Sequence, residues 1–204
     1  GERFPFGASI PRDKAMASDV LLADTMNGAP LPRLHGAPLR LIVPGYIGAR
    51  SVKWLARIRL REAPSDNHYQ ATDYRIPSPN AENGPALTDQ PVNSLICTPD
   101  DGGTVDAGDV LVSGWAYAGN RSVVRVDVTA DGGRTWTEAE LAPQLSKWAW
   151  RFWEAVVSLP RGRHEIAVRA VDDAANSQPE RLDTVWNPPG YVQNAWSRRA
   201  VEAV

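Results

Sequence analysis

Basic side chains and glycines alternate in one short stretch of the sequence, residues 35–54. The basic residues that could carry chemistry there are His35, Arg40, Arg50 and Lys53. Glycine lets backbone N–H groups approach a ligand closely because it has no Cβ, and the cations supply counter-charge for an anion. This combination predicts a binding site for a phosphate-bearing cofactor. A structural ion pair is an equally good interpretation of Arg50.

Short strands must position these loops. Residues 39–43 form an apolar segment between the two cation-bearing loops, and residues 20–23 form a second one. Asn27-Gly28 indicates a hairpin turn, because both residue types tolerate positive φ. Residues 52–60 alternate apolar and basic side chains, which is the pattern of a half-buried strand. We therefore expect a small group of strands to hold the loops.

The chain changes character after residue 91 and becomes entirely β-like. Apolar residues at 124, 126 and 128, and again at 166, 168 and 170, alternate with mostly charged ones, and Trp148, Trp150 and Phe152 follow the same period. Asp131-Gly-Gly is a tight-turn signal between two such segments. Short strands at this spacing predict an immunoglobulin-like β-sandwich. The single cysteine means that this sandwich has no internal disulfide.

Composition excludes several function classes. The net charge of −2 gives no basic field for nucleic acid, and no apolar run is long enough to span a membrane. No closely spaced set of metal-ligating residues occurs, so we expect no metal ligand in this chain. The carboxylate pairs Asp100-Asp101 and Asp172-Asp173 fall in predicted turns, where solvated charges are the rule.

Several long strings of residues resemble the sulfite oxidase family. The longest is His35-Gly-x-Pro-x-Arg-x-x-x-Pro-Gly-x-x-Gly-Ala-Arg-x-Val-Lys-Trp-Leu, and Asp131-Gly-Gly-x-Thr-Trp and Trp148-Ala-Trp-Arg-x-Trp follow in the family's order. The resemblance implies a mainly β chain with two parts. Residues 1–75 would be the end of an α+β molybdopterin domain, residues 76–90 a linker, and residues 91–204 an immunoglobulin-like dimerisation domain.

The resemblance also assigns roles to individual residues. It gives molybdopterin binding to His35, Arg40, Ser51, Val52 and Lys53. Val52 would act through its main chain, and the cations would hold the cofactor's phosphate. Tyr74 matches a catalytic tyrosine that the family places beside the exchangeable oxygen of molybdenum. The family's metal-binding cysteine would lie upstream, because Cys97 falls at the start of the dimerisation domain.

The implied activity is oxidation of sulfite to sulfate by oxygen-atom transfer, with an electron acceptor such as a cytochrome. The implied partners are a second copy of the chain, bound through the C-terminal domain, and the remainder of the enzyme upstream. The implied location is the periplasm, where bacterial relatives are often found. No nucleic acid and no membrane are expected as partners.

One departure from the family leaves the substrate open. The family's sulfite-binding arginine position holds Pro189, which offers neither charge nor donor. Arg198 and Arg199 are basic residues in the following tail. Sulfane dehydrogenase and nitrate reductase activities therefore remain alternatives. So does a non-catalytic dimerisation and binding module that pairs through exposed tryptophan rings.

Overall fold

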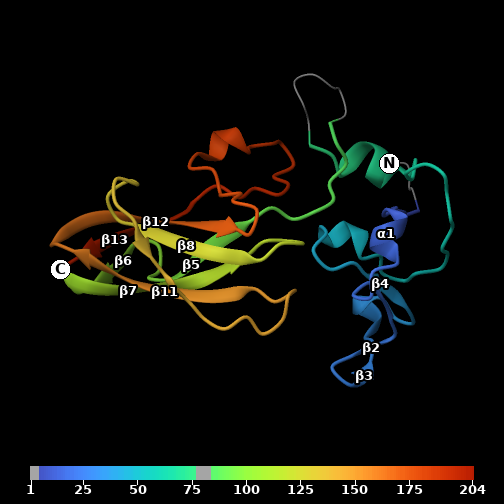
Figure 1. Cartoon of the computed structure of the whole chain (residues 1–204), viewed down its shortest axis with the longest axis horizontal. Coiled ribbons are helices and arrows are strands. Elements are labelled where there is room, and N and C mark those ends of the chain that lie inside the picture. Colours follow the sequence, from blue (N-terminus) through green and yellow to red (C-terminus); the bar gives the residue numbers. More distant parts are fainter. Residues whose placement is uncertain (1–4, 77–83) are drawn as a thin grey trace. The chain divides into compact units, whose positions relative to one another are not determined.

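A computed structural model describes residues 5–76 and 84–204. The chain forms two compact units, Gly1–Gln90 and Pro91–Val204 (Figure 1). Figure 1 colours the first unit from blue to green and the second from green to red. The described part is mainly β, as the sequence predicts, and in it no helix is long and apolar enough to cross a membrane.

The first unit contains short elements joined by long loops. In chain order they are α1 Arg12–Ala15, β1 Leu21–Ala23, β2 Thr25–Met26, β3 Ala29–Pro30, the 3₁₀ helix η1 Arg33–His35, β4 Arg40–Ile42, the 3₁₀ helix η2 Gly48–Arg50 and the π-helix η3 Tyr69–Asp73. β1 pairs antiparallel with β4, and β2 pairs antiparallel with β3. Asn27 and Gly28 have φ of 53° and 77°, which confirms the predicted hairpin turn between β2 and β3.

The strand predicted over residues 52–60 is absent from the described structure. Trp54 has a left-handed φ of 51°, which interrupts the extended backbone that a strand requires. Two hydrogen bonds join this segment to the β4 region, from Leu41 N to Val52 O and from Leu55 N to Leu39 O. Beyond them Ile58 and Leu60 are 70% and 92% exposed. The alternating pattern is present, but no ladder continues beside it.

Residues 76–90, predicted as a linker, lie within the first unit. Residues 77–83 fall outside the described part of the chain. The remainder of the segment forms isolated bridges from Arg75 to Ala86 and from Tyr46 to Asp89, and Leu87 is buried. Residues 84–90 are therefore packed within the first unit.

The second unit is a sandwich of two antiparallel-rich sheets. Its elements are β5 Asn93–Thr98, β6 Gly103–Val105, β7 Gly108–Tyr117, β8 Val123–Thr129, β9 Thr137–Glu138, β10 Glu140–Leu141, β11 Arg151–Leu159, β12 Gly162–Asp172, the 3₁₀ helix η4 Leu182–Thr184 and β13 Ser197–Ala203. The four-stranded sheet has the order β10-β11-β7-β5, and the five-stranded sheet has the order β6-β13-β12-β8-β9. The predicted sandwich is therefore present.

One apolar core fills the space between the sheets. Ile166, Val168 and Ala170 on β12 are all fully buried, which confirms the inward face predicted for this strand. β11 begins only at Arg151, later than the alternating aromatic residues suggested. In this strand Trp153 enters the core at 2% exposure.

Two turns of the sandwich bear on the predictions made from the sequence. Asp172 is 3% exposed and its Oδ1 accepts from the backbone N–H groups of Ala174 and Asn176 at 2.9 Å. The expectation that it is a solvated loop charge is wrong, because the turn needs an internal acceptor. At the other turn, Gly132 and Gly133 have φ of 73° and 86°, which confirms the predicted tight turn.

Candidate cofactor site

The loop after η1 and the loop after η2 approach each other closely beside β4. Gly36 is buried with a φ of +110°, and a Cβ at this position would lie 3.0 Å from Lys53 Cβ and 3.1 Å from Lys53 Cα. Only glycine combines this φ with such a close approach. Gly36 O also accepts from Trp54 N at 3.3 Å. The glycine predicted to allow close approach therefore brings one predicted binding loop against the other.

Residues 51–53 are fixed along β4 by main-chain and hydroxyl contacts. Val52 O accepts from Leu41 N at 2.9 Å, and Ser51 Oγ accepts from Val43 N at 2.9 Å. A hydroxyl that accepts one hydrogen bond can still donate its own proton. Ser51 and Val52 thus hold the loop in place, and both are half-buried beside the strand.

Three basic residues meet at this junction, and we call His35, Arg40 and Lys53 the cationic cradle. Arg40 Nη1 donates to His35 O at 3.0 Å, and Lys53 Nζ donates to the neighbouring Leu34 O at 3.1 Å. Both long side chains are therefore oriented by the carbonyls of the single 3₁₀ helix η1. The structure brings the predicted residues His35, Arg40 and Lys53 together.

The cradle has unused capacity for an anion. Arg40 Nε is buried and has no hydrogen-bond partner among the described residues. Neither Arg40 nor Lys53 pairs with a carboxylate in residues 5–76 or 84–204. A buried guanidinium N–H without an acceptor is costly unless a ligand completes it. This donor set fits a phosphate-bearing group such as the pterin cofactor.

Arg50 has a different role from the cradle cations. It is 2% exposed, and both its Nε and its Nη2 donate to Leu87 O, at 3.0 and 2.7 Å. Its Nη1 donates to the side-chain oxygen of Gln70. Burial lowers the pKa of Arg50 and, together with nearby Asp89, raises the pKa of Tyr46. Arg50 is therefore neither exposed to a ligand nor, in the described structure, part of an ion pair.

Tyr74 follows η3 and is positioned by a separate set of contacts. Its N–H donates to Tyr69 O, and its carbonyl accepts from Leu87 N, both at 2.9 Å. Leu87 is also the residue whose carbonyl binds Arg50. Through Leu87, the guanidinium of Arg50 thus links the 3₁₀ helix η2 to the segment that carries Tyr74.

Sequence reasoning missed two polar residues that support this link. Gln70 is buried, and its side chain exchanges hydrogen bonds with Ser9, from Ser9 N to Oε1 at 2.6 Å and from Nε2 to Ser9 Oγ at 2.7 Å. Ser9 Oγ also accepts from Ser65 N at 2.9 Å. Nothing in the sequence pattern around Gln70 indicates burial.

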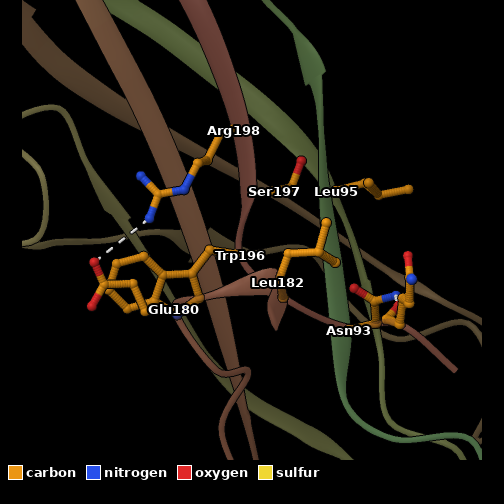
Figure 2. A pocket seen from close by; sticks show the side chains of 9 residues that line it. Asn93, Leu95, Glu180, Leu182, Trp196, Ser197 and Arg198 are labelled. Atoms are coloured by element: carbon orange, nitrogen blue, oxygen red, sulfur yellow. Dashed lines mark hydrogen bonds and ion pairs between the residues drawn. The ribbon is translucent and has the colours of Figure 1, made fainter. Parts of the chain in front are cut away.

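The second unit has a pocket of about 340 Å³ (Figure 2). It is lined by Asn93, Leu95, Glu180, Leu182, Gln193, Ala195, Trp196, Ser197 and Arg198. Figure 2 shows Arg198 reaching toward Glu180, with Nη2 and Oε1 3.7 Å apart, and Arg198 also pairs with Glu165. Arg199 donates to Ile96 O at 2.9 Å. Both tail arginines are thus already engaged within the sandwich.

The loop with Pro189 is built around a buried asparagine. Asn187 Oδ1 accepts from Tyr191 N, and Asn187 Nδ2 donates to Tyr191 O, both at 2.8 Å. Gly190 follows with a φ of +72°, and Pro189 is exposed at the tip. The loop presents no donor or charge at this position.

Among the described residues, no three His, Cys, Asp or Glu side chains lie close enough together to hold a metal ion. The first unit contains the cationic cradle, and the second unit is a β-sandwich. This pairing matches two family models, the oxidoreductase molybdopterin binding domain over residues 1–69 and the Mo-co oxidoreductase dimerisation domain over residues 85–204. The chain belongs to the family of molybdenum-cofactor oxidoreductases with this dimerisation domain.

Individual relatives agree with this assignment. The chain is 43% identical to the mitochondrial sulfite oxidase of Rattus norvegicus over 215 residues, which cover 98% of this chain and 39% of the relative. It is 37% identical to inducible nitrate reductase [NADH] 1 of Glycine max, over 95% of this chain and 25% of the relative. The resemblance to the sulfite oxidase family is confirmed. The chain spans about two fifths of the length of the rat protein.

A solved structure shows the same fold. The crystal structure of the sulfane dehydrogenase SoxCD from Paracoccus pantotrophus matches with a TM-score of 0.79 and 27% identity, over 97% of this chain and 54% of that chain. The fold match thus extends over both units.

Proposed function

We propose that the protein containing this chain oxidises sulfite, or a related sulfur compound, to sulfate at a molybdenum cofactor. The observation that carries the proposal is the cationic cradle. It contains a buried Arg40 N–H that has no partner among the described residues, inside the segment that matches the molybdopterin binding domain. The relatives named sulfite oxidase support the reaction class.

The residues of this chain would hold the cofactor rather than its metal. Arg40 and Lys53 would donate charge-assisted hydrogen bonds to the phosphate, with His35 beside them. Ser51 and the main chain of Val52 would keep the second loop against β4. When bound, the cofactor supplies oxygen-atom transfer and two-electron redox chemistry. The phenol of Tyr74 would hold or pass a proton at the reacting centre.

The partners follow from the family. The second unit would join two copies of the chain, because the matching model is a dimerisation domain. The metal-binding cysteine would come from the remainder of the enzyme upstream, and a cytochrome would accept electrons. A periplasmic location is proposed on the resemblance to bacterial relatives.

Oxidation of a sulfane sulfur is a second candidate substrate class. The exposed Pro189 offers no donor where the resembled family binds the sulfite anion, and the fold match is to a sulfane dehydrogenase. Two assays would separate the candidates: steady-state reduction of an artificial dye acceptor by sulfite or by a sulfane-sulfur donor, and oxidation of the reduced dye by nitrate. Turnover with sulfite is expected to be the highest of the three.

Cofactor content tests the proposal without relying on turnover. The full-length protein is expected to carry molybdenum and a pterin, measured by elemental analysis and by fluorescence of the oxidised pterin. Arg40→Ala should lower the cofactor affinity by roughly tenfold to a hundredfold, because it removes a charge-assisted contact. Arg59→Ala, which removes an exposed arginine outside the cradle, is the matched control.

Absence of both molybdenum and pterin from the full-length protein would contradict the proposal. It would leave the non-catalytic dimerisation module as the function of this chain. Equal pterin content in wild type and Arg40→Ala would reject the cradle as the phosphate site while leaving the reaction class intact.

A further inference from the structure

The two sheets of the sandwich present different outer surfaces. On the four-stranded sheet, the residues that alternate with the buried ones are mainly apolar. We call them the apolar face: Leu95, Leu111, Trp115, Trp150, Phe152 and Val156. The exposed fractions of Leu111, Phe152 and Val156 are 52%, 53% and 53%.

The strand register gathers these side chains into two rows. Phe152 lies opposite Trp115, and Trp115 lies opposite Leu95, across β11, β7 and β5. Leu111 and Val156 form the second row. Trp150, 57% exposed just before β11, extends the first row, with its ring centroid 6.0 Å from that of Trp115. The patch therefore spans three strands.

The outer surface of the five-stranded sheet is charged and internally paired. Arg163 Nε lies 3.1 Å from Glu202 Oε2, and Arg169 Nε lies 3.1 Å from the buried Asp127 carboxylate. Arg198 pairs with Glu165 on the same surface. Val124, 52% exposed, belongs to β8 of this sheet and falls at the register shift between β8 and β12. These charges favour contact with water rather than with another protein.

We infer that the apolar face is the surface through which two copies of this chain pair. The inference rests on the proposed dimerisation and adds which surface performs it. The exposed parts of its side chains amount to on the order of 500 Å², which is in the range of the largest apolar patch on a soluble protein, and such a patch often has a function. A standard interface needs about 800 Å² from each partner. The face thus supplies more than half of what a stable dimer requires.

If the two copies are related by a two-fold axis, this face also constrains the position of that symmetry axis. Each side chain of the patch meets the same patch on the second copy. Glu154 stands between the two rows on β11, opposite Glu140 on the edge strand β10. Charged residues are depleted from interface cores. The axis therefore passes nearer to the aromatic row, on the side away from β10, and leaves the two carboxylates toward the rim.

Two matched substitutions test the face on the full chain. Val156→Lys places a charge on the apolar face, and Val124→Lys places the same charge on a strand of the other sheet, at nearly the same starting exposure. Sedimentation equilibrium would give the dimer dissociation constant of each protein. Val156→Lys should raise this constant at least about tenfold, because the change enters the interface twice. Val124→Lys should leave it unchanged.

Equal effects of the two substitutions, or a larger effect of Val124→Lys, would overturn the choice of surface while leaving dimerisation intact. A wild-type chain that stays monomeric at all concentrations would contradict the proposed dimerisation itself. If Val156→Lys fails to fold, hydroxyl-radical footprinting of the wild type decides. Trp150 should be protected at concentrations that favour the dimer, relative to exposed Trp186 as an internal reference, and equal oxidation of both would reject the face.

Discussion

The interior of each unit is stabilised by a different kind of contact. The sandwich buries a continuous set of aliphatic side chains between its sheets, many of them at zero exposure. The first unit buries few apolar residues, among them Leu31, Val43 and Ile47, and its interior also contains Arg50 and Gln70. A ligand-binding unit built from loops thus depends on specific polar contacts, whereas the sandwich depends on apolar area.

The largest effect should come from the core of the sandwich. Ile166 is fully buried at the centre of β12. Ile166→Ala is expected to lower the free energy of unfolding by about 3 kcal/mol, because it removes buried methylene groups and leaves a cavity. Chemical denaturation followed by tryptophan fluorescence would measure it.

Exposed Val124→Ala on the neighbouring strand is the control, and its effect should stay within about 0.5 kcal/mol. The comparison between the units would fail if the two substitutions had similar effects. In that case apolar burial would not be what holds the sandwich.

The second effect should be confined to the first unit. Arg50→Met keeps the apolar stem but leaves Leu87 O without its two guanidinium donors. We expect a loss of about 2–3 kcal/mol in local stability, because a buried acceptor loses a charged partner. Amide hydrogen exchange at Leu87, whose N–H is bonded to Tyr74 O, would report it.

Exchange at Ile166 should not change in Arg50→Met, and exposed Arg59→Met should change neither position. Unchanged exchange at Leu87 would show that the guanidinium does not hold the loops together. Faster exchange in both units would show that they do not respond separately.

This difference explains what could be predicted from the sequence. Alternation with period two identified the inward face of β12, and Asn27-Gly28 identified a turn, because both signals are local. The strand predicted from the same alternation at residues 52–60 was wrong. A strand also needs a neighbouring strand, and Trp54 breaks the extended backbone. The interior position of Arg50 has no local signal, because its partners Gln70 and Leu87 come from a distant part of the chain.

The residues of the candidate site also differ in whether a local sequence pattern could predict them. His35, Arg40 and Lys53 could be named in advance because they stand in one string of residues, and the structure brings them together through the carbonyls of η1. Tyr74 could be named only through the resemblance. Its placement depends on Leu87, which is separated from it by residues with no periodic pattern.

The smallest effect should come from the polar contacts of an exposed turn in the second unit, the turn after β8. Hydrogen bonds from the hydroxyl and N–H of Thr135, from Thr129 Oγ1 and from Arg134 N hold the pKa of Asp131 well below its usual range. A carboxylate with a depressed pKa stabilises the folded state above its unfolded pKa of about 3.9, and this contribution is lost as the pH falls through the folded-state pKa. Asp131→Asn should therefore be less stable than wild type near neutral pH, and the difference should shrink below about pH 4.

Urea denaturation of both proteins across this pH range would measure that difference, and other carboxylates cancel because both proteins contain them. A difference that is constant with pH would mean that the charge of Asp131 does not support the turn. A difference at neutral pH as large as that of Ile166→Ala would break the contrast between the units, because a solvent-exposed polar turn would then matter as much to the sandwich as its core.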